Sequence, residues 1–364
     1  MKDTKQKQIF EHHNLDILQG YTCSEPVYRM HVMQRNYSLC CGHWNSVIFP
    51  PWRDETRKLM SLRDMWTHPL AEELRQSVIV DKDYKYCHNT QCPYLQNPDL
   101  HMTKNHNNRY VQSWKNNEFF IPILSFDVDD SCQLKCPSCR LDYIYNRDIM
   151  ETQPPVKQIT EEVLYHFDRG NIQYLNMNST GDPFISPACV YLMDNVKGIK
   201  DFSEIHLHTN GLKFTKRWWD NHENLHDMVK HLQISLDAGD KESYEKVRLG
   251  GNWETIIENI DFFGRELSHI DITLNLILQA NNYKSVPKFI EIAHKYNFHA
   301  NIMRIAQWGH LTDEAHAELA VWKEGHPQHA DYVDMIKSLP DLSKIRVSFG
   351  NLINGLKQYR NDMK

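Results

Sequence analysis

The chain has 364 residues, of which 41% are hydrophobic and 24% are charged, and its formal net charge is −6. This composition is typical of a globular protein with one large domain or two ordinary ones. The sequence has no run of about 18 or more apolar residues and no apolar signal segment, so we expect a cytoplasmic protein without a membrane span. Lysine and arginine are scattered along the chain, so no general nucleic-acid surface is expected.

The segment 1–115 is rich in Cys, Trp, Tyr, His and Asn and holds few long apolar runs. One helix is expected over 62–77, with a kink or a restart at Pro69. A segment with so little apolar core gains stability when a bound metal centre cross-links it. We therefore expect 1–115 to form a small domain of its own.

From residue 116 onward, short apolar runs alternate with amphipathic stretches, which predicts βαβ units and a parallel sheet. Periodicity alone does not separate an open sheet from a curved partial barrel. The helix expected over 252–267 opens at Asn252, a favourable N-cap. The expected strands are 121–128, 173–179, 204–209, 231–237, 271–278 and 300–305, and the other expected helices are 158–169, 186–197, 214–228 and 285–297. The segment 311–364 is expected to add helices over 313–324 and 328–338 and a strand over 345–349.

Cys132, Cys136 and Cys139 form a C-x3-C-x2-C run directly after the strand expected over 121–128. Three thiolates on one loop can hold three irons of a [4Fe-4S] cluster and leave the fourth iron without a protein ligand. Electron-carrier clusters use four cysteines, so an open iron indicates a site for a substrate or cofactor. Buried cysteines or a zinc loop are the alternatives, but zinc needs a fourth ligand and no His or Cys lies close downstream.

This run resembles the cluster-binding loop of the radical SAM superfamily, and the resemblance extends in order over about residues 120–305. It implies an α/β fold, a partial (β/α)6 TIM-like barrel over 116–310, preceded by the Cys-rich domain 1–115 and followed by the extension 311–364. It also implies a [4Fe-4S] cluster that reductively cleaves S-adenosylmethionine (SAM) to a 5′-deoxyadenosyl radical. Such an enzyme needs a reducing electron donor such as flavodoxin or ferredoxin.

The resemblance also implies contacts with the methionine part of SAM. Thr180, Gly181 and Asp182 stand where the family has Gly-Gly-Glu, a segment that binds the SAM amino group. This sequence departs from the family twice, with Thr180 for the first glycine and Asp182 for the glutamate. The acidic acceptor is retained on a shorter side chain.

Ser235-Leu-Asp-Ala followed by Tyr244 and Arg248 resembles the SLDA…Y-x3-R pattern of enzymes that modify peptides or make the molybdenum-cofactor precursor. The resemblance assigns Ser235 and Arg248 to the ribose and the carboxylate of SAM, and Asn275 is a further candidate for a ribose contact. By this analogy we expect oxidative modification of a C–H bond in a peptide or protein. The alternatives are a dehydrogenase or epimerase acting on a small molecule or sugar, and a non-catalytic iron–sulfur or zinc protein.

The segment before residue 115 holds a second set of cysteines, Cys23, Cys40, Cys41, Cys87 and Cys92. Their pattern resembles a SPASM or twitch domain, which carries auxiliary [4Fe-4S] clusters, although in most such enzymes this domain follows the barrel. Cys23, Cys87 and Cys92 with either Cys40 or Cys41 would ligate one auxiliary cluster. A tetrahedral zinc site with the same thiolates remains the alternative.

Three further side chains are assigned from their positions in the expected elements. Cys189 stands alone in an apolar helix and is expected to be a core residue. His206 and His208 share one face of the strand expected over 204–209. We expect them to line the substrate site if that face points into the barrel.

Overall fold

The computed structural model describes residues 21–40, 49, 51–52, 59–87, 92–96, 108–177, 180–307 and 310–360. The chain divides into two compact units. The first comprises Met1–Asp129, Asp148–Met177 and Tyr191–Glu204, and the second comprises Asp130–Arg147, Asn178–Val190 and Ile205–Lys364. The two units are divided at other residues than the expected domain boundaries at 115 and 310. These expected boundaries stay predictions.

The first unit contains four strands in the order β2-β1-β3-β4, namely β1 (Arg29–Met33), β2 (Tyr37–Ser38), β3 (Ile121–Asp127) and β4 (Ile172–Met177). β1 and β2 are antiparallel, whereas β1–β3 and β3–β4 are parallel. The expected strand 121–128 is present, and so is the described part of 173–179; residues 178–179 lie outside the described residues. β1 was not predicted, although Met30 and Val32 are buried in the alternating pattern of a strand.

The helices of the first unit are mostly short. The helix expected over 62–77 is interrupted before Pro69, because Pro69 starts a new helix instead of continuing the first one. The first piece begins with a capping box between Ser61 and Asp64. The bounds are α2 (Glu25–Tyr28), α3 (Leu62–Trp66), α4 (Pro69–Arg75), η2 (Gln76–Asp81), α5 (Pro93–Gln96), α7 (Arg109–Lys115), α8 (Ile149–Thr152) and α9 (Pro154–Phe167). α10 (Pro187–Asn195) runs from the second unit into the first.

The second unit contains parallel strands in the order β5-β6-β7-β8-β9. Their bounds are β5 (Glu204–Thr209), β6 (Val229–Ser235), β7 (Asp271–Leu278), β8 (His299–Arg304) and β9 (Val347–Ser348), in agreement with the expected strands to within two residues at most ends. β5 begins at Glu204, the last residue of the first unit, and continues into the second. Parallel strands joined by helices make this an α/β fold of the kind expected for a partial barrel.

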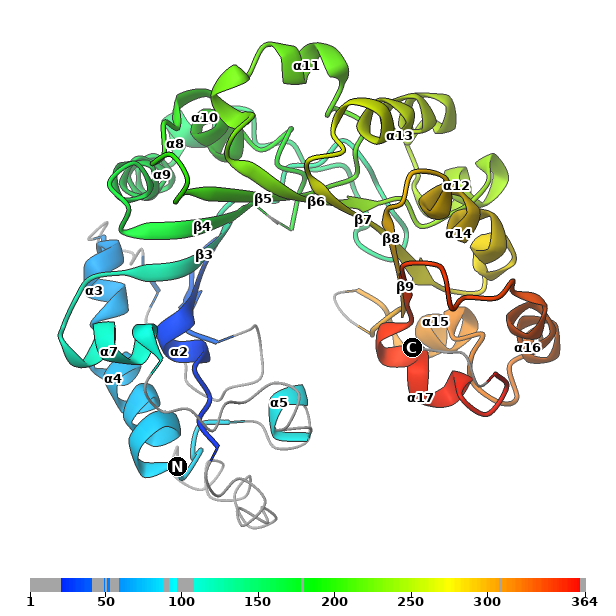
Figure 1. The fold of residues 1–364 in the computed structure, drawn as a ribbon, viewed down its shortest axis with the longest axis horizontal. Coiled ribbons are helices and arrows are strands. Elements are labelled where there is room, and N and C mark those ends of the chain that lie inside the picture. Colours follow the sequence, from blue (N-terminus) through cyan, green and yellow to red (C-terminus); the bar gives the residue numbers. More distant parts are fainter. Residues whose placement is uncertain are drawn as a thin grey trace. The chain divides into compact units, whose positions relative to one another are not determined.

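Figure 1 shows α12, α13 and α14 along one side of strands β6 to β8. α13 begins after the predicted N-cap Asn252, whose side chain accepts a hydrogen bond from the N–H of Thr255. The helix expected over 214–228 was wrong beyond Asp220, since the polar run Asp220-Asn221-His222 ends α11 and only a short 3-10 turn follows. The bounds are α11 (Lys216–Asp220), η3 (Glu223–Leu225), α12 (Lys241–Val247), α13 (Trp253–Glu266), η4 (Tyr283–Ser285), α14 (Val286–Lys295), α15 (Asp313–Leu319), α16 (His329–Ser338), η5 (Gly350–Leu352) and α17 (Ile353–Leu356).

The strands of the second unit have one apolar and one polar face. On β5, Ile205, Leu207 and Thr209 are buried, whereas the alternate residues are partly exposed. The apolar face packs against helices, and the polar face carries the side chains that form the candidate site. Buried members of this core are Leu207, Leu232, Ile234, Leu274, Leu276, Ile256, Ile260, Phe263, Phe289, Ile290 and Ile302.

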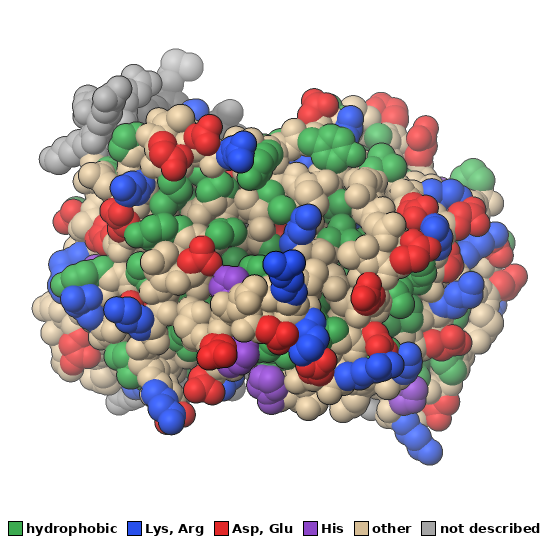
Figure 2. All heavy atoms as spheres, turned by 90° about the horizontal axis from the view of Figure 1, so that it is seen from above, with side chains coloured by type: hydrophobic (Ala, Val, Ile, Leu, Met, Phe, Trp, Pro, Cys, Tyr) green, Lys and Arg blue, Asp and Glu red, His purple; other side chains and the backbone are tan. Residues whose placement is uncertain are grey.

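Lysine and arginine, which are scattered along the sequence, are also scattered over the face of the molecule drawn in Figure 2. On the face drawn in Figure 2, acidic and basic side chains are interspersed. Among the described residues, no helix combines the length and apolar character that a membrane crossing requires.

Asn259 joins α13 to the turn after β5. Its buried amide donates to the carbonyl oxygens of Gly211 and Leu212, at 2.8 and 3.3 Å. Asn259→Ala would leave these acceptors unpaired, so we expect the free energy of unfolding to fall by about 1–3 kcal/mol in chemical denaturation. Glu258→Ala, which changes an exposed position on the same helix, should have little effect; equal losses in both variants would contradict this assignment.

Candidate active site

The loop with the three cysteines follows β3 in the chain and belongs to the second unit. Cys136 is buried, Cys132 is half-buried and Cys139 is exposed. The N–H groups of Cys139 and Arg140 both donate to the carbonyl oxygen of Cys136, at 2.9 and 3.1 Å. Cys136 also lies within electrostatic reach of the other two thiols, so the turn gathers the predicted ligands.

Backbone hydrogen bonds hold this loop to neighbouring segments of the same unit. The N–H of Cys132 donates to the carbonyl oxygen of Ile144 at 2.8 Å, and the N–H of Lys135 donates to that of Leu249 at 2.9 Å. The guanidinium group of Arg140 donates to the carbonyl oxygens of Asp130 and Thr180. Arg140 therefore ties the cysteine loop to the segment that was expected to bind the SAM amino group.

Gly181 lies directly against the cysteine loop. A Cβ atom at this position would lie 2.1 Å from the carbonyl oxygen of Ser131, a distance that no real side chain tolerates. The N–H of the next residue, Asp182, donates to that same oxygen at 2.8 Å. Only glycine allows this approach, so the predicted Thr180-Gly181-Asp182 segment does meet the cysteine loop.

Asp182 is buried and its carboxylate is largely committed to protein partners. One oxygen accepts from the hydroxyl of Thr209 at 2.7 Å and from the N–H of Asn210 at 2.8 Å; the other accepts from the N–H of Phe184 at 3.0 Å. Burial raises the pKa of Asp182, and these three hydrogen bonds act against that rise. A carboxylate offers about four lone-pair positions, so about one remains for a further donor such as an amino group.

Arg248 is buried between a carboxylate and a cysteine. One of its terminal nitrogens lies 2.7 Å from Asp237 Oδ2, and the other lies 3.6 Å from the sulfur of Cys136. Burial works against the charge of Arg248, but Asp237 and Cys136 outweigh it and raise the pKa of the guanidinium. The buried Nε has no hydrogen-bond partner, so Arg248 keeps a donor for an anionic group, as its predicted contact with a carboxylate requires.

The thiols lie where N–H donors can stabilise thiolates. Burial raises the pKa of Cys132 to about 11, partly offset by the N–H of Leu134, which lies 3.4 Å from the sulfur. The side-chain amide of Asn210 is a second donor, 3.9 Å from the same sulfur. Burial likewise raises the pKa of Cys136, and Arg248 lowers it again. Buried thiols with N–H donors suit a bound metal, whose positive charge displaces the thiol proton.

Ser235 and Asn275 lie in one row of paired residues across the strands. Ser235 pairs with Asn275, Asn275 with Asn301, and Asn301 with Ser348. The hydroxyl of Ser348 donates to Asn301, Asn301 donates to Asn275 at 2.8 Å, and Asn275 donates to Gln233 at 3.4 Å. The predicted ribose contact Asn275 therefore belongs to a hydrogen-bonded row of uncharged side chains, and Ser235 lies next to it in register, with its hydroxyl 2.9 Å from His208 Nε2.

Cys23 lies near Cys87 and Cys92 in the N-terminal set of cysteines. Burial raises the pKa of Cys23 well above its usual value, and the nearby thiols of Cys87 and Cys92 raise it further. These three predicted ligands are thus close neighbours. Cys40 is half-buried, with its N–H 3.2 Å from Ser38 Oγ, and Cys41 lies outside the described residues. Cys189 is buried on α10, as predicted for a core residue.

Three polar residues of the site were not predicted. Asp237 directly follows Leu236 of the SLDA segment and adopts a left-handed backbone with φ of 59°. Arg140 follows Cys139, and Asn210 is the middle residue of the Thr209-Asn210-Gly211 turn. Asp237 lies within the SLDA segment, Arg140 adjoins the cysteine run, and Asn210 directly follows the strand expected over 204–209, and these positions are the signal that could have identified them.

The comparisons with known proteins agree with this geometry. Residues 129–293 match the family model described as the radical SAM superfamily. They form a radical SAM enzyme domain. The cysteine loop, Asp182, Ser235, Arg248 and Asn275 all lie inside the matched range. Such a domain uses a [4Fe-4S] cluster together with SAM, as the sequence indicated.

Curated relatives of the radical SAM domain are distant. A GTP 3′,8-cyclase of Rhizobium etli (strain ATCC 51251 / DSM 11541 / JCM 21823 / NBRC 15573 / CFN 42) is 21% identical over 202 residues, 53% of this chain and 54% of that protein. A GTP 3′,8-cyclase of Pseudomonas fluorescens (strain Pf0-1) is 23% identical over 203 residues, 54% of this chain and 58% of that protein. The chain thus spans about half the length of the curated relatives it matches.

Solved structures match this chain only at low identity. The crystal structure of SuiB from Streptococcus suis bound to S-adenosylmethionine matches with a TM-score of 0.45 and 13% identity. The match covers 79% of this chain and 62% of that chain.

His208 gives the site a pH dependence. Its Nε2 lies 2.9 Å from Ser235 Oγ, and burial, with the charge of Arg248, lowers its pKa to about 4. The unfolded chain, with a pKa of about 6.5, binds more protons than the folded chain between these values. Stability therefore is fully present above pH of about 6.5 and is lost as the pH falls toward 4.

His208→Gln should remove this contribution. In denaturation experiments at pH 7 and pH 5, we expect the variant to lose less stability on acidification than the parent, by about 2 kcal/mol. His294→Gln, which changes an exposed histidine on α14, is the matched control. Its free energy of unfolding should change between pH 7 and pH 5 as much as that of the parent. An unchanged pH dependence in His208→Gln would contradict the buried, neutral state of His208.

Proposed function

We propose that Cys132, Cys136 and Cys139 hold the [4Fe-4S] cluster of this radical SAM domain and that the chain cleaves SAM reductively there. One observation carries the assignment. The cysteine loop, the Gly181 segment and Arg248 meet at one place, with the Arg248 guanidinium 3.6 Å from Cys136 and Gly181 against Ser131. Three thiols, N–H donors and a buried cation are the donor set that a cluster with an exchangeable iron and a zwitterionic ligand requires.

When bound by Cys132, Cys136 and Cys139, a reduced [4Fe-4S] cluster would supply the electron for cleavage of the sulfonium C–S bond of SAM to methionine and a 5′-deoxyadenosyl radical. The chain's own residues position SAM for this step. Arg248 offers its free Nε to the carboxylate, and Asp182 offers its remaining acceptor to the amino group. Ser235 and Asn275 supply neutral hydrogen-bonding groups for the ribose hydroxyls. The buried ion pair of Arg248 with Asp237 keeps the guanidinium oriented.

The substrate we propose is a peptide or protein whose C–H bond is oxidised by the radical. Support comes from the SLDA…Y-x3-R segment, in which Tyr244 is buried and Arg248 reaches the cysteine loop. A small molecule is the second candidate, because the curated relatives of this domain are GTP 3′,8-cyclases. Incubation with peptide and nucleotide pools, followed by mass spectrometry for a loss of two hydrogens or for cyclised nucleotide, separates the two.

For the N-terminal segment 1–115 we propose an auxiliary [4Fe-4S] cluster bound by Cys23, Cys87 and Cys92. Cys40 or Cys41 would complete the set. The mutual influence of the thiols of Cys23, Cys87 and Cys92 supports this proposal, and zinc in the same place is the alternative outcome. A flavodoxin or ferredoxin is proposed as the electron donor, because SAM cleavage consumes a low-potential electron.

Replacing Cys132, Cys136 and Cys139 together by Ala should abolish 5′-deoxyadenosine formation. We expect the reconstituted iron content to fall by about four per chain, because one [4Fe-4S] cluster loses its ligands. The measurements are iron analysis and chromatography of 5′-deoxyadenosine after reduction with dithionite. Cys189→Ala, which changes a buried cysteine of α10, should keep both iron and activity. Full SAM cleavage by the triple variant would overturn the assignment.

Replacing Cys23, Cys87 and Cys92 by Ser tests the auxiliary site separately. We expect a loss of about four irons per chain with continued reductive cleavage of SAM, because the site of cleavage keeps its own ligands. Substrate oxidation should be lost. A chain that binds zinc but no second iron cluster at these cysteines would instead establish the zinc alternative.

A further inference from the structure

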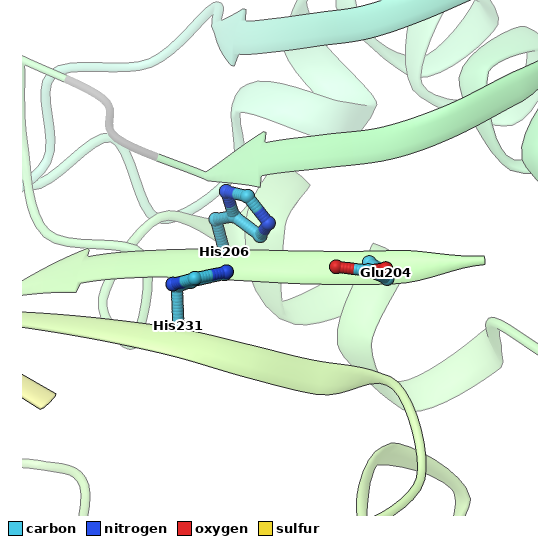
Figure 3. A group of neighbouring side chains, drawn as sticks. All are labelled: Glu204, His206 and His231. Carbon is cyan, nitrogen blue, oxygen red and sulfur yellow. The ribbon is translucent and has the colours of Figure 1, made fainter. Parts of the chain in front are cut away.

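Two histidines lie side by side on neighbouring strands of the second unit. His206 on β5 pairs in register with His231 on β6, and their ring centroids are 4.3 Å apart at an angle of 61°. Glu204, the first residue of β5, stands two positions before His206 and therefore points to the same side of that strand. Figure 3 shows the two imidazole rings next to each other, with the Glu204 carboxylate further along β5.

The three side chains are close enough to share one ion. A ligand atom from each of Glu204, His206 and His231 lies within 4.8 Å of the other two. Two imidazoles and a carboxylate are a common ligand set of first-row divalent metals, and Zn²⁺ takes it with a water molecule in the fourth position. This set differs from the cysteines of the radical SAM domain, which are soft ligands suited to iron–sulfur clusters.

A second carboxylate supports the ligand role of His231. Asp271 at the start of β7 lies 3.6 Å from Nδ1 of His231, which leaves Nε2 available for a metal. Asp271 is itself held by Arg346, whose terminal nitrogen lies 2.9 Å from its Oδ1. A carboxylate behind a histidine fixes the ring orientation and raises the basicity of the other nitrogen, which is the usual arrangement around metal-binding histidines.

The position of the cluster separates it from the SAM site. His206 shares a face of β5 with His208, which bonds to Ser235 near Arg248, and precedes it by two residues. Two residues of a strand span about 6.6 Å, so the imidazoles lie nearer the amino end of the strands than the SAM contacts do. An ion at His206 would therefore occupy a place of its own on the polar face.

We propose that Glu204, His206 and His231 form a binding site for one divalent ion of the zinc class, with Asp271 supporting His231. The site completes its coordination with water, and its occupancy does not depend on the iron–sulfur cluster or on SAM. It assigns a ligand function to side chains that neither the cluster chemistry nor the SAM contacts use. Of the two histidines predicted to line the substrate site, His206 thus takes a different role.

Zinc titration of the full chain with its iron–sulfur clusters reconstituted tests this site. We expect one zinc ion per chain beyond the iron content, and weak or no binding in His206→Gln and His231→Gln. Gln keeps the polar, uncharged character of each position, so these variants avoid the packing loss of Ala. His294→Gln, an exposed histidine on α14, is the matched control and should bind zinc like the parent.

The support from Asp271 is tested by a pair of variants. Asp271→Asn should weaken zinc binding by about 10- to 100-fold, because the outer carboxylate is lost. Arg346→Gln breaks the ion pair between Arg346 and Asp271 but leaves the Asp271 carboxylate facing His231. Zinc affinity should therefore stay near that of the parent. Equal losses in both variants would show that Asp271 acts only through Arg346.

Co²⁺ in place of zinc identifies the ligands directly. We expect visible d–d bands of a nitrogen and oxygen site without the near-ultraviolet charge transfer of thiolate ligands. A thiolate spectrum, or unchanged zinc affinity in both His206→Gln and His231→Gln, would overturn the proposal. The triple cysteine variant of the cluster loop separates the two assignments, because it should lose SAM cleavage and keep this zinc ion.

Discussion

The close approach of Gly181 to Ser131 is the constraint on which the rest of the site depends. The carbonyl oxygen of Ser131 receives the N–H of Asp182, and a side chain at position 181 would collide with that oxygen. The carboxylate of Asp182 then holds the turn after β5 through Thr209 and Asn210. One short segment thereby fixes the cysteine loop on one side and the end of a strand on the other.

Charge is distributed in this site so that each buried ion has a partner. Arg248 lies between Asp237 and Cys136, while Asp182 is stabilised by three hydrogen bonds and by the charge of Arg248. Buried charges without such partners would cost several kcal/mol each, on the order of the whole stability of a domain. A zwitterionic ligand can therefore bind here without the free-energy cost of burying an isolated charge.

Sequence patterns located most of the elements and singled out the cysteine loop, but they did not report the contacts between these segments. The strands 204–209 and 271–278 were located correctly because each is a continuous β-rich run with clear ends. The three cysteines of the loop were found because their spacing alone encodes the chemistry. Asn210 and Asp182 meet across 28 residues of sequence, and no local pattern reports such a contact. β1 was missed because it is only five residues long and lies in a segment that is rich in Cys, His and Asn and holds few long apolar runs.

The uncharged row across β6 to β9 has a direction. Ser348 donates to Asn301, Asn301 to Asn275, and Asn275 to Gln233, so every hydrogen of the row points from β9 toward β6. Hydrogen bonds aligned in this way polarise one another, and each strengthens the next. The row therefore connects Gln233 on β6 to the hydroxyl of Ser348, three strands away, through hydrogen bonds that all run in one direction.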